Sequence, residues 1–357
     1  MFRAVLLFSM NRSITTNATP HAHPRRSIVV GRRSGCAESR WSLQIGKGGI
    51  QGAVWCPWRA IDGALPPLVR YQNGLERPGR TDVVAAWRRA RRLSQAGGVV
   101  FSPREDALVG DDLAARDAAY MILADILAGG TAVALTTRVG LAGGEQLLAL
   151  ARRFPSLISV RIGIFGGPPD EERRWEDGLP TRADRLELVA ALVKTGAHIE
   201  VEVGPIIPFV NDNEVAWKAL LRAIARAGAR TVVPRFLAGS PELVSQVEKE
   251  IAPSAGRMVL GWLSRGVEEP WFRASRGSRR GPLSHVPSSD IVRALPLQAR
   301  QPRLRRLTEL AAAANLTVRT CACFDGGRAH VCHALQARPQ VVRQLDLQLE
   351  FLGAMRA

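Results

Sequence analysis

Residues 196–230 read GAHIEVEVGPIIPFVNDNEVAWKALLRAIARAGAR, and this stretch decides the fold class. Its first part, 199–203, is a short β-rich run, and 214–227 is a longer amphipathic window of helical period. Asn213 stands where a helix N-cap is wanted, and Gly228 stands where a left-handed C-cap is wanted before the next apolar run. We therefore predict a strand, a turn and a helix in this order, which is one βα unit.

Four further βα units flank this one. Their strands are expected at 99–102, 131–136, 158–164 and 231–236, and their helices at 113–127, 144–153, 181–195 and 241–251. Such alternation of β-rich runs and amphipathic windows is typical of successive βα units on a parallel sheet. An earlier candidate strand at 27–30 would bring the number of strands to six. The pattern predicts an α/β fold with a parallel sheet.

The sequence divides into four parts. Residues 1–97 form an irregular N-terminal region with the candidate first strand at 27–30, and residues 98–252 hold the βα units. Residues 253–306 are rich in Arg, Ser, Gly and Pro and are expected to be a linker. Residues 307–357 form a C-terminal extension with a helix near 304–314, a strand near 316–319 and a group of Cys and His residues.

Composition narrows the class of protein. The chain has 357 residues, of which 46% are hydrophobic, and no apolar run approaches the roughly 18 residues that span a bilayer. Five cysteines are an odd count at irregular spacing, which fits a reducing cytoplasm better than a secreted disulfide framework. A formal net charge of +17 favours a polyanionic partner, although arginines spread along solvated helix faces would give the same total. We expect a cytoplasmic monomer that is not a membrane protein.

The first 37 residues contain no acidic residue and six arginines, with a short apolar stretch at 4–10. Two interpretations stay open for this segment. It is a disordered or mis-annotated start, or it has a targeting role.

Three segments resemble the spore photoproduct lyase-like branch of the radical SAM superfamily. The first is the turn Pro-Ile-Ile-Pro followed by Asn-Asp, at 205–212. The second is ISVRIGIFGGPPDEERRWEDGLPTRADRLELVAALVKTGA, at 158–197, and the third is FSPREDALVGDDLAARDAAYMILADIL, at 101–127. The resemblance covers residues 98–252 and implies a parallel (βα)6-type partial TIM barrel.

The resemblance also implies cofactors and a reaction. Members of this superfamily hold a 4Fe-4S cluster on three cysteines in a C-x3-C-x2-C loop after the first strand, and the cluster binds S-adenosylmethionine. Reductive cleavage of S-adenosylmethionine then starts radical chemistry on a substrate. Here Cys36 stands where the first ligand is expected, while Arg40 and Leu43 occupy the next two positions. A side chain without a thiolate does not ligate a cluster iron in the usual way.

Further cofactor-binding candidates follow the strands. Glu105 and Asp106 come just after the second expected strand, and Asn211 and Asp212 come after the strand in the opening segment. Ligands of parallel α/β sheets bind outside the carboxyl ends of the strands, so these side chains are placed to meet a cofactor. The alternative is that residues of the second group only end the strand and begin the helix.

The C-terminal stretch TCACFDGGRAHVCHAL, at 320–335, is a candidate metal site. Cys321, Cys323 and Cys332, with His330 or His333, could surround one ion. Thiolate ligands at this density suit zinc or an iron-sulfur cluster. Thiol-disulfide chemistry and no role at all remain alternatives.

The Arg-rich segment is the candidate nucleic-acid site. Arginine pairs bidentately with phosphate and stacks on bases. The residues expected to bind nucleic acid or another polyanion are Arg279, Arg280, Arg303, Arg305 and Arg306. The alternative is a basic linker without a specific partner.

Three hypotheses on function therefore stay open. The chain is a radical SAM-family iron-sulfur enzyme with an unknown substrate. Alternatively, it is a degenerate, non-catalytic barrel that binds nucleic acid or another polyanion. Finally, residues 1–97 could be a damaged or mis-started gene end that hides a normal cluster loop.

Overall fold

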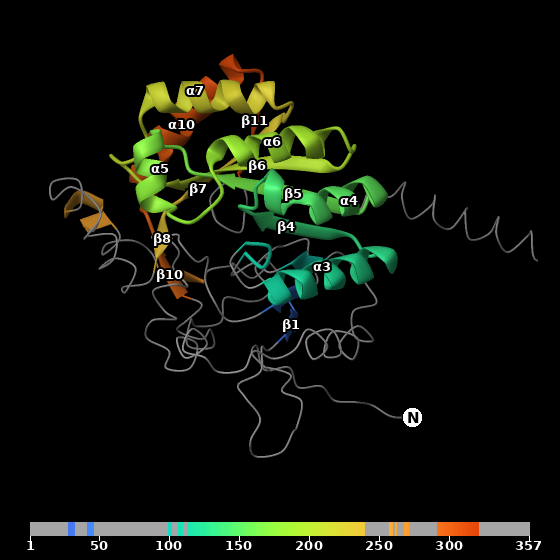
Figure 1. Cartoon of the computed structure of the whole chain (residues 1–357). Coiled ribbons are helices and arrows are strands. Elements are labelled where there is room, and N and C mark those ends of the chain that lie inside the picture. Colours follow the sequence, from blue (N-terminus) through green and yellow to red (C-terminus); the bar gives the residue numbers. More distant parts are fainter. Residues whose placement is uncertain are drawn as a thin grey trace, which may run out of the picture.

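The computed structural model describes residues 28–32, 41–45, 99–101, 106–109, 113–239, 257–259, 261–262, 268–270 and 291–320. Their central feature is an eight-stranded sheet in the order β1-β2-β3-β4-β5-β6-β7-β11 (Figure 1). Every neighbouring pair from β2 to β11 is parallel. The strands are β1 Ile28–Arg32, β2 Trp41–Ile45, β3 Val99–Phe101, β4 Val133–Thr137, β5 Ile158–Ile164, β6 His198–Ile206, β7 Thr231–Phe236 and β11 Thr317–Val318. The predicted α/β fold with a parallel sheet is confirmed.

The N-terminal strands differ from the prediction. The strand expected at 27–30 is present as β1, but β1 is antiparallel to β2, and Arg32 pairs with Trp41 at the amino end of β2. The first parallel strand is β2, which lies where we expected an irregular connection. Six parallel strands run from β2 to β7. The first of them begins at residue 41, which is 14 residues after the start of the candidate first strand at 27.

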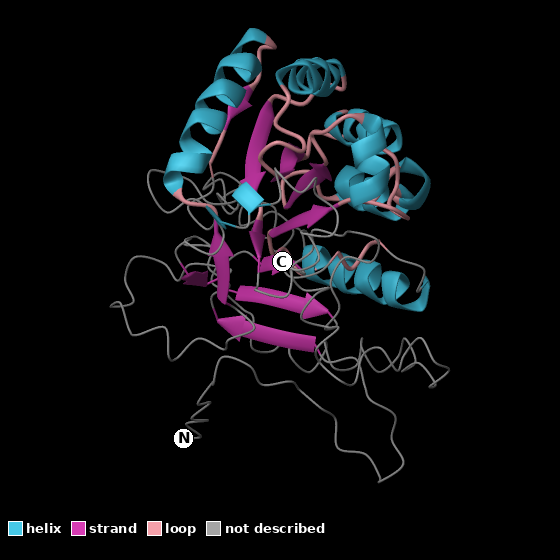
Figure 2. Cartoon of the chain, turned by 90° about the vertical axis from the view of Figure 1, so that its left-hand side faces the viewer, coloured by secondary structure: helices cyan, strands magenta, loops and turns pink. Residues whose placement is uncertain are grey.

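Helices follow the strands and lie on the outer side of the curved sheet, as Figures 1 and 2 show together. They are α3 Leu113–Ala128, α4 Glu145–Arg153, α5 Pro169–Trp175, α6 Arg182–Val193, α7 Glu214–Arg226 and α10 Leu297–Ala313. The predicted caps are confirmed, because Asn213 accepts from two backbone N–H groups of α7, and Gly228 has a φ of 87°. The helix predicted at 241–251 lies outside the described residues. None of the described helices is both long and apolar enough to cross a membrane.

The C-terminal part is more ordered than a linker. Helix α10 runs through the expected boundary at residue 306, and it packs against α7. Strand β11 then adds to the edge of the sheet beside β7, which confirms the strand predicted near 316–319. A second, antiparallel sheet has the order β8-β10-β9, with β8 Ala238–Gly239, β10 Ile291–Ala294 and β9 Glu268–Pro270. The prediction of a linker over 253–306 is therefore wrong for these elements.

The two faces of the parallel sheet have different chemistry. Successive side chains of a strand point to opposite faces. On β5 and β6, the residues that join the hydrophobic core beneath the helices are Ile158, Val160, Ile162, Ile164, Ile199, Val201 and Val203. The alternate residues are Ser159, Arg161, Gly163, Glu200, Glu202 and Gly204. Strands of parallel sheets are usually apolar on both faces, so the buried charges on the inner face indicate a specialised surface.

Candidate ligand site at the carboxyl ends of the strands

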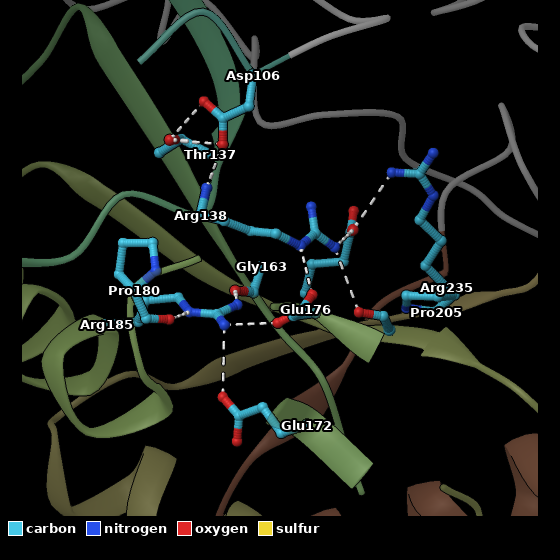
Figure 3. A network of polar contacts seen from close by, with 12 residues as sticks. Asp106, Thr137, Arg138, Gly163, Glu172, Glu176, Pro180, Arg185, Pro205 and Arg235 are labelled. Atoms are coloured by element: carbon cyan, nitrogen blue, oxygen red, sulfur yellow. Dashed lines mark hydrogen bonds and ion pairs between the residues drawn. The ribbon is translucent and has the colours of Figure 1, made fainter. Parts of the chain in front are cut away.

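A chain of buried ion pairs crosses the inner face near the carboxyl ends of β4, β6 and β7. Arg138 follows β4 directly, and its Nε lies 3.0 Å from the carboxylate of Glu176. Its Nη2 lies 3.4 Å from Glu202 on β6 and donates to the carbonyl of Gly204 at 3.3 Å. Arg235 on β7 reaches the same Glu202 carboxylate at 3.3 Å. Figure 3 shows Arg138, Glu176 and Arg235, which come from different parts of the chain, in this network.

Arg185 extends this chain toward α5 and α6. Its Nη2 lies 2.5 Å from Glu176 and 3.4 Å from Glu172. Its other nitrogens donate to the carbonyls of Gly163 and Pro180, both at 2.8 Å (Figure 3). The Arg185 side chain is 1% exposed, so its guanidinium is shielded from water. Buried charges of this kind persist only when they are paired and hydrogen-bonded.

Two glycines leave room for close approaches on the inner face, Gly163 for the guanidinium of Arg138 and Gly204 for the backbone of Arg235. A Cβ at Gly163 would lie 2.7 Å from Cζ of Arg138, and a Cβ at Gly204 would lie 2.5 Å from the backbone oxygen of Arg235. Both approaches are closer than any side chain tolerates. A side chain at position 204 would therefore displace backbone, whereas one at position 163 would displace the guanidinium of Arg138.

A second layer of charge lies deeper along β5 and β6. Arg161 contacts Glu200 at 2.7 Å, and Arg319, just after β11, contacts the same carboxylate at 2.9 Å. Burial by itself raises the pKa of Glu200, but the bond from His198 and the guanidinium groups hold it well below its usual range. Burial likewise opposes ionisation of Glu202, yet Arg235 and Arg138 lower its pKa. Both carboxyls are therefore ionised at neutral pH.

Asp106 lies at this edge, but its carboxylate is engaged within the chain. It accepts from the hydroxyl of Thr137 at 2.8 and 3.0 Å, from the backbone N–H of Arg138, and from that of Leu108 at 3.2 Å (Figure 3). Burial raises its pKa, and the bonds from Arg138 and Thr137 oppose that rise. These contacts fix the end of β4, and a contact with a cofactor stays a prediction. Glu105 lies outside the described residues.

Asn211 and Asp212 shape the turn after β6. The fully buried amide of Asn211 accepts from the N–H of Ile207 at 2.6 Å and donates to the carbonyl of Pro205 at 2.7 Å. Asp212 accepts from the N–H of Phe209 at 2.8 Å. These bonds support the alternative of a structural role for both residues, and their proposed cofactor binding stays a prediction.

The remaining predicted site residues fall into two groups. Those outside the described residues are Cys36, Cys321, Cys323, Cys332, His330, Arg279 and Arg280. The described ones, Arg303, Arg305 and Arg306, lie on α10. Arg303 pairs with Asp212 at 2.7 Å, and Arg306 pairs with Glu214 at 2.5 Å and Glu309 at 2.8 Å. Two of the expected polyanion-binding arginines therefore tie α10 to the segment around the start of α7.

The usual iron-sulfur site does not fit the residues present. Among the described residues no group of three or more His, Cys, Asp or Glu is arranged to hold a metal ion. All five cysteines lie outside the described residues, and the sequence contains no C-x3-C-x2-C triplet. Cys36 falls between β1 and β2, so it precedes the first parallel strand, whereas the loop that the resemblance implies follows that strand.

Sequence analysis missed the most densely paired residues of the site. Arg138, Arg185, Glu176 and Glu202 were not among the candidates. One signal pointed to them: the run Ile-Glu-Val-Glu-Val, at 199–203, places two carboxylates on one face of a strand that the fold buries on both faces. Such a pattern requires buried cationic partners.

Comparisons with known proteins support the fold. No family model matches the chain. Uncharacterized proteins of Mycobacterium tuberculosis and Mycobacterium bovis are each 29% identical over 163 residues. That match covers 45% of this chain and 44% of each relative, so the chain spans less than half the length of the curated relatives it matches.

The fold of this chain is similar to that of solved structures of spore photoproduct lyase. One, complexed with dinucleoside spore photoproduct, has a TM-score of 0.52 at 12% identity, covering 82% of this chain and 79% of that chain. A mutant with bound AdoMet and dinucleoside spore photoproduct has a TM-score of 0.52 at 14% identity, covering 78% and 76%. The expected resemblance is confirmed at the level of architecture: the chain shares the α/β fold of the solved spore photoproduct lyase structures.

Proposed function

We propose that this chain binds S-adenosylmethionine at the carboxyl-end edge of its parallel sheet and, with its cysteines as they stand, does not cleave it reductively. The observation that carries the proposal is the inner face itself, where Arg138, Arg235, Glu176 and Glu202 bring both signs of charge to one edge. The spore photoproduct lyase mutant of the same fold holds AdoMet, which supports this choice of ligand.

The chemistry of the inner face suits S-adenosylmethionine better than it suits a cluster. The methionyl part of S-adenosylmethionine carries an ammonium and a carboxylate, which carboxylate and guanidinium groups recognise by charge-assisted hydrogen bonds. Arg235 is the candidate for the ligand carboxylate, since its side chain is 14% exposed whereas that of Arg138 is 1% exposed. A cluster needs thiolates, and none lies among the described inner-face residues.

Binding tests this proposal without any need for turnover. Isothermal titration of S-adenosylmethionine into the parent chain should give saturable binding, and Arg235→Met should weaken it about tenfold or more, since a hydrogen bond to a charged group is lost. Arg173→Met is the matched control, because its ion pair with Asp170 is 80% and 86% exposed, and it should bind like the parent. No binding by the parent, or equal losses in both variants, would contradict the proposal.

A second candidate function keeps the cluster but moves its ligands to the C-terminal tail. The observation that favours it is β11, which runs parallel to β7 and ends at Val318, three residues before Cys321. The described chain therefore runs toward the carboxyl-end edge just before the cysteine-rich segment begins. In this candidate, Cys321, Cys323 and Cys332 hold zinc or an iron-sulfur cluster.

Metal analysis separates the two candidates. Anaerobically purified parent, Cys36→Ser, and a triple Cys321/Cys323/Cys332→Ser variant are assayed for zinc, iron and sulfide. Metal that is lost only in the triple variant supports the tail site, and loss in both variants supports one cluster shared between Cys36 and the tail. Absence of metal from the parent removes this second candidate.

Polyanion binding by the five arginines named above remains a separate proposal. Because two of them are already paired with acids, we expect Arg279, Arg280 and Arg305 to contribute more than Arg303 and Arg306. Binding should weaken steeply between about 50 and 200 mM salt, as phosphate contacts release counterions. Binding that is insensitive to salt would contradict it.

A further inference from the structure

The turn between β6 and α7 carries an aromatic surface that the proposed binding of S-adenosylmethionine does not use. Phe209 is 48% exposed, and its ring stacks on Trp262 with centroids 5.7 Å apart and an interplanar angle of 23°. Cζ of Arg303 lies 5.1 Å from the centroid of Phe209 and 5.4 Å from that of Trp262. We call these three side chains the aromatic platform.

The backbone holds Phe209 in an unusual conformation. Its φ is +67°, in the left-handed region that bulky side chains rarely adopt. The N–H of Phe209 is fixed by the carboxylate of Asp212, whose other oxygen accepts from Arg303 at 2.7 Å. A strained, half-exposed aromatic residue that is held by such a network points to a functional constraint on the ring.

Arg303 is itself fixed and forms one side of the platform. Its Nη1 donates to the carbonyl of Ala299 at 2.9 Å, and its side chain is only 16% exposed. The guanidinium lies over both rings, and Phe209 is still 48% exposed beside Arg303 and Trp262. A flat, partly exposed ring on a rigid support is suited to stacking with another planar group.

The surroundings of the platform favour an anionic partner. The two helices that pack together beside it, α7 and α10, are both basic. Helix α7 has a net charge of +2, from Lys218, Arg222 and Arg226 against Glu214. Helix α10 has a net charge of +3, from four arginines against Glu309. The whole chain carries +17. A planar group on a polyanion is a nucleobase of single-stranded nucleic acid, whose bases stack on aromatic side chains while basic residues track the backbone.

We propose that the aromatic platform of Phe209, Trp262 and Arg303 is a stacking site for a nucleobase of single-stranded nucleic acid. This site does not depend on the proposed binding of S-adenosylmethionine or on the tail metal site, because it requires neither that ligand nor a cysteine, and it adds a base-stacking ring to the proposed polyanion binding. Duplex DNA, whose bases already stack on one another, should bind it more weakly than a single strand.

The test compares a strand that has bases with one that lacks them. Fluorescence anisotropy measures binding of labelled oligo-dT of about 15 nucleotides, and of an abasic strand of equal length, at about 50 mM salt. The parent should prefer oligo-dT, and Phe209→Leu should weaken oligo-dT binding at least about fivefold while leaving abasic binding unchanged. Phe209→Tyr keeps the ring and should bind within about twofold of the parent.

Further variants make the result decisive. Phe209→Gly removes the ring and adopts the positive φ without strain, so it should show the same loss of oligo-dT binding through a different backbone preference. Val215→Ala is the matched control, because Val215 is 75% exposed on the adjacent helix and has no ring. The proposal is overturned if the parent does not bind oligo-dT, or if Phe209→Leu weakens oligo-dT and abasic binding equally. It is also overturned if the platform variants change only self-association or vesicle binding.

Discussion

Replacing Arg185 by Met tests whether the inner-face ion pairs stabilise the fold. Arg185 is fully buried and bonds to two carboxylates, Glu172 and Glu176, and to two backbone carbonyls. Methionine has a similar length and no charge, so the substitution removes these bonds with little change in volume. The two buried carboxylates then lose a cationic partner.

The expected loss of stability follows from this geometry. Removing one partner of a buried ion pair costs about 3–5 kcal/mol, because the other charge is left buried. Glu176 keeps Arg138 at 3.0 Å, and Glu172 keeps Arg182 at 2.8 Å, so neither carboxylate is left alone. We therefore expect the low end of the range, about 3 kcal/mol, which is a large part of the 5–15 kcal/mol typical of a folded domain.

Urea unfolding followed by far-UV circular dichroism measures this change. The midpoint should fall while the dependence of the unfolding free energy on urea stays constant. Arg173→Met, at an exposed ion pair, serves as control and should shift the unfolding free energy by no more than about 0.5 kcal/mol. A loss below about 1 kcal/mol for Arg185→Met would refute the argument that these pairs organise the inner face.

Three further predictions follow from single positions. Gly204→Ala should destabilise the fold by about 1–3 kcal/mol in urea unfolding, since its Cβ would lie 2.5 Å from the backbone oxygen of Arg235, and an unchanged midpoint would contradict this. The pKa of Glu202 is lowered in the fold, so its contribution to stability is present above the ordinary value of 4.5 and is lost as the pH falls through the lowered value. Glu202→Gln should therefore be less stable than the parent at neutral pH and should lose less stability in acid. Parallel curves of unfolding free energy against pH for the two proteins would count against this. Bonds from Arg306 and Lys218 lower the pKa of Glu214 to about 2, and NMR titration should show this pKa rising toward its ordinary range in Arg306→Gln; an unchanged titration would reject the pairing.

Local sequence patterns predict the βα units because the periodicity of each strand and helix, and the residues that cap each helix, lie close together in sequence. The β-rich run at 199–203, the cap Asn213 and the C-cap Gly228 all appear as expected, as β6 and α7. The orientation of β1 could not be predicted in this way. A strand has no intrinsic direction relative to its neighbour, and the antiparallel pairing depends on β2, which lies in the N-terminal region that the sequence predicts to be irregular.

Pairing between residues far apart in sequence explains the other differences between the predicted and the observed structure. Composition predicts a linker over 253–306, but Arg303 and Arg306 on α10 pair with acids 91 and 92 residues earlier, at and just before the start of α7. Arg138 and Glu202 are 64 residues apart, so only the fold brings them together. Sequence alone could flag carboxylates on a buried strand, but it could not identify their partners.

Formation of 5′-deoxyadenosine is the most direct measurement of the central claim. The parent chain is purified anaerobically, treated with iron and sulfide, reduced with dithionite and given S-adenosylmethionine, and the product is quantified by chromatography. Because the sequence has no C-x3-C-x2-C triplet and its described residues hold no group of metal ligands, we predict saturable binding of S-adenosylmethionine with no deoxyadenosine above the protein-free control. Robust, protein-dependent deoxyadenosine formation would contradict the account.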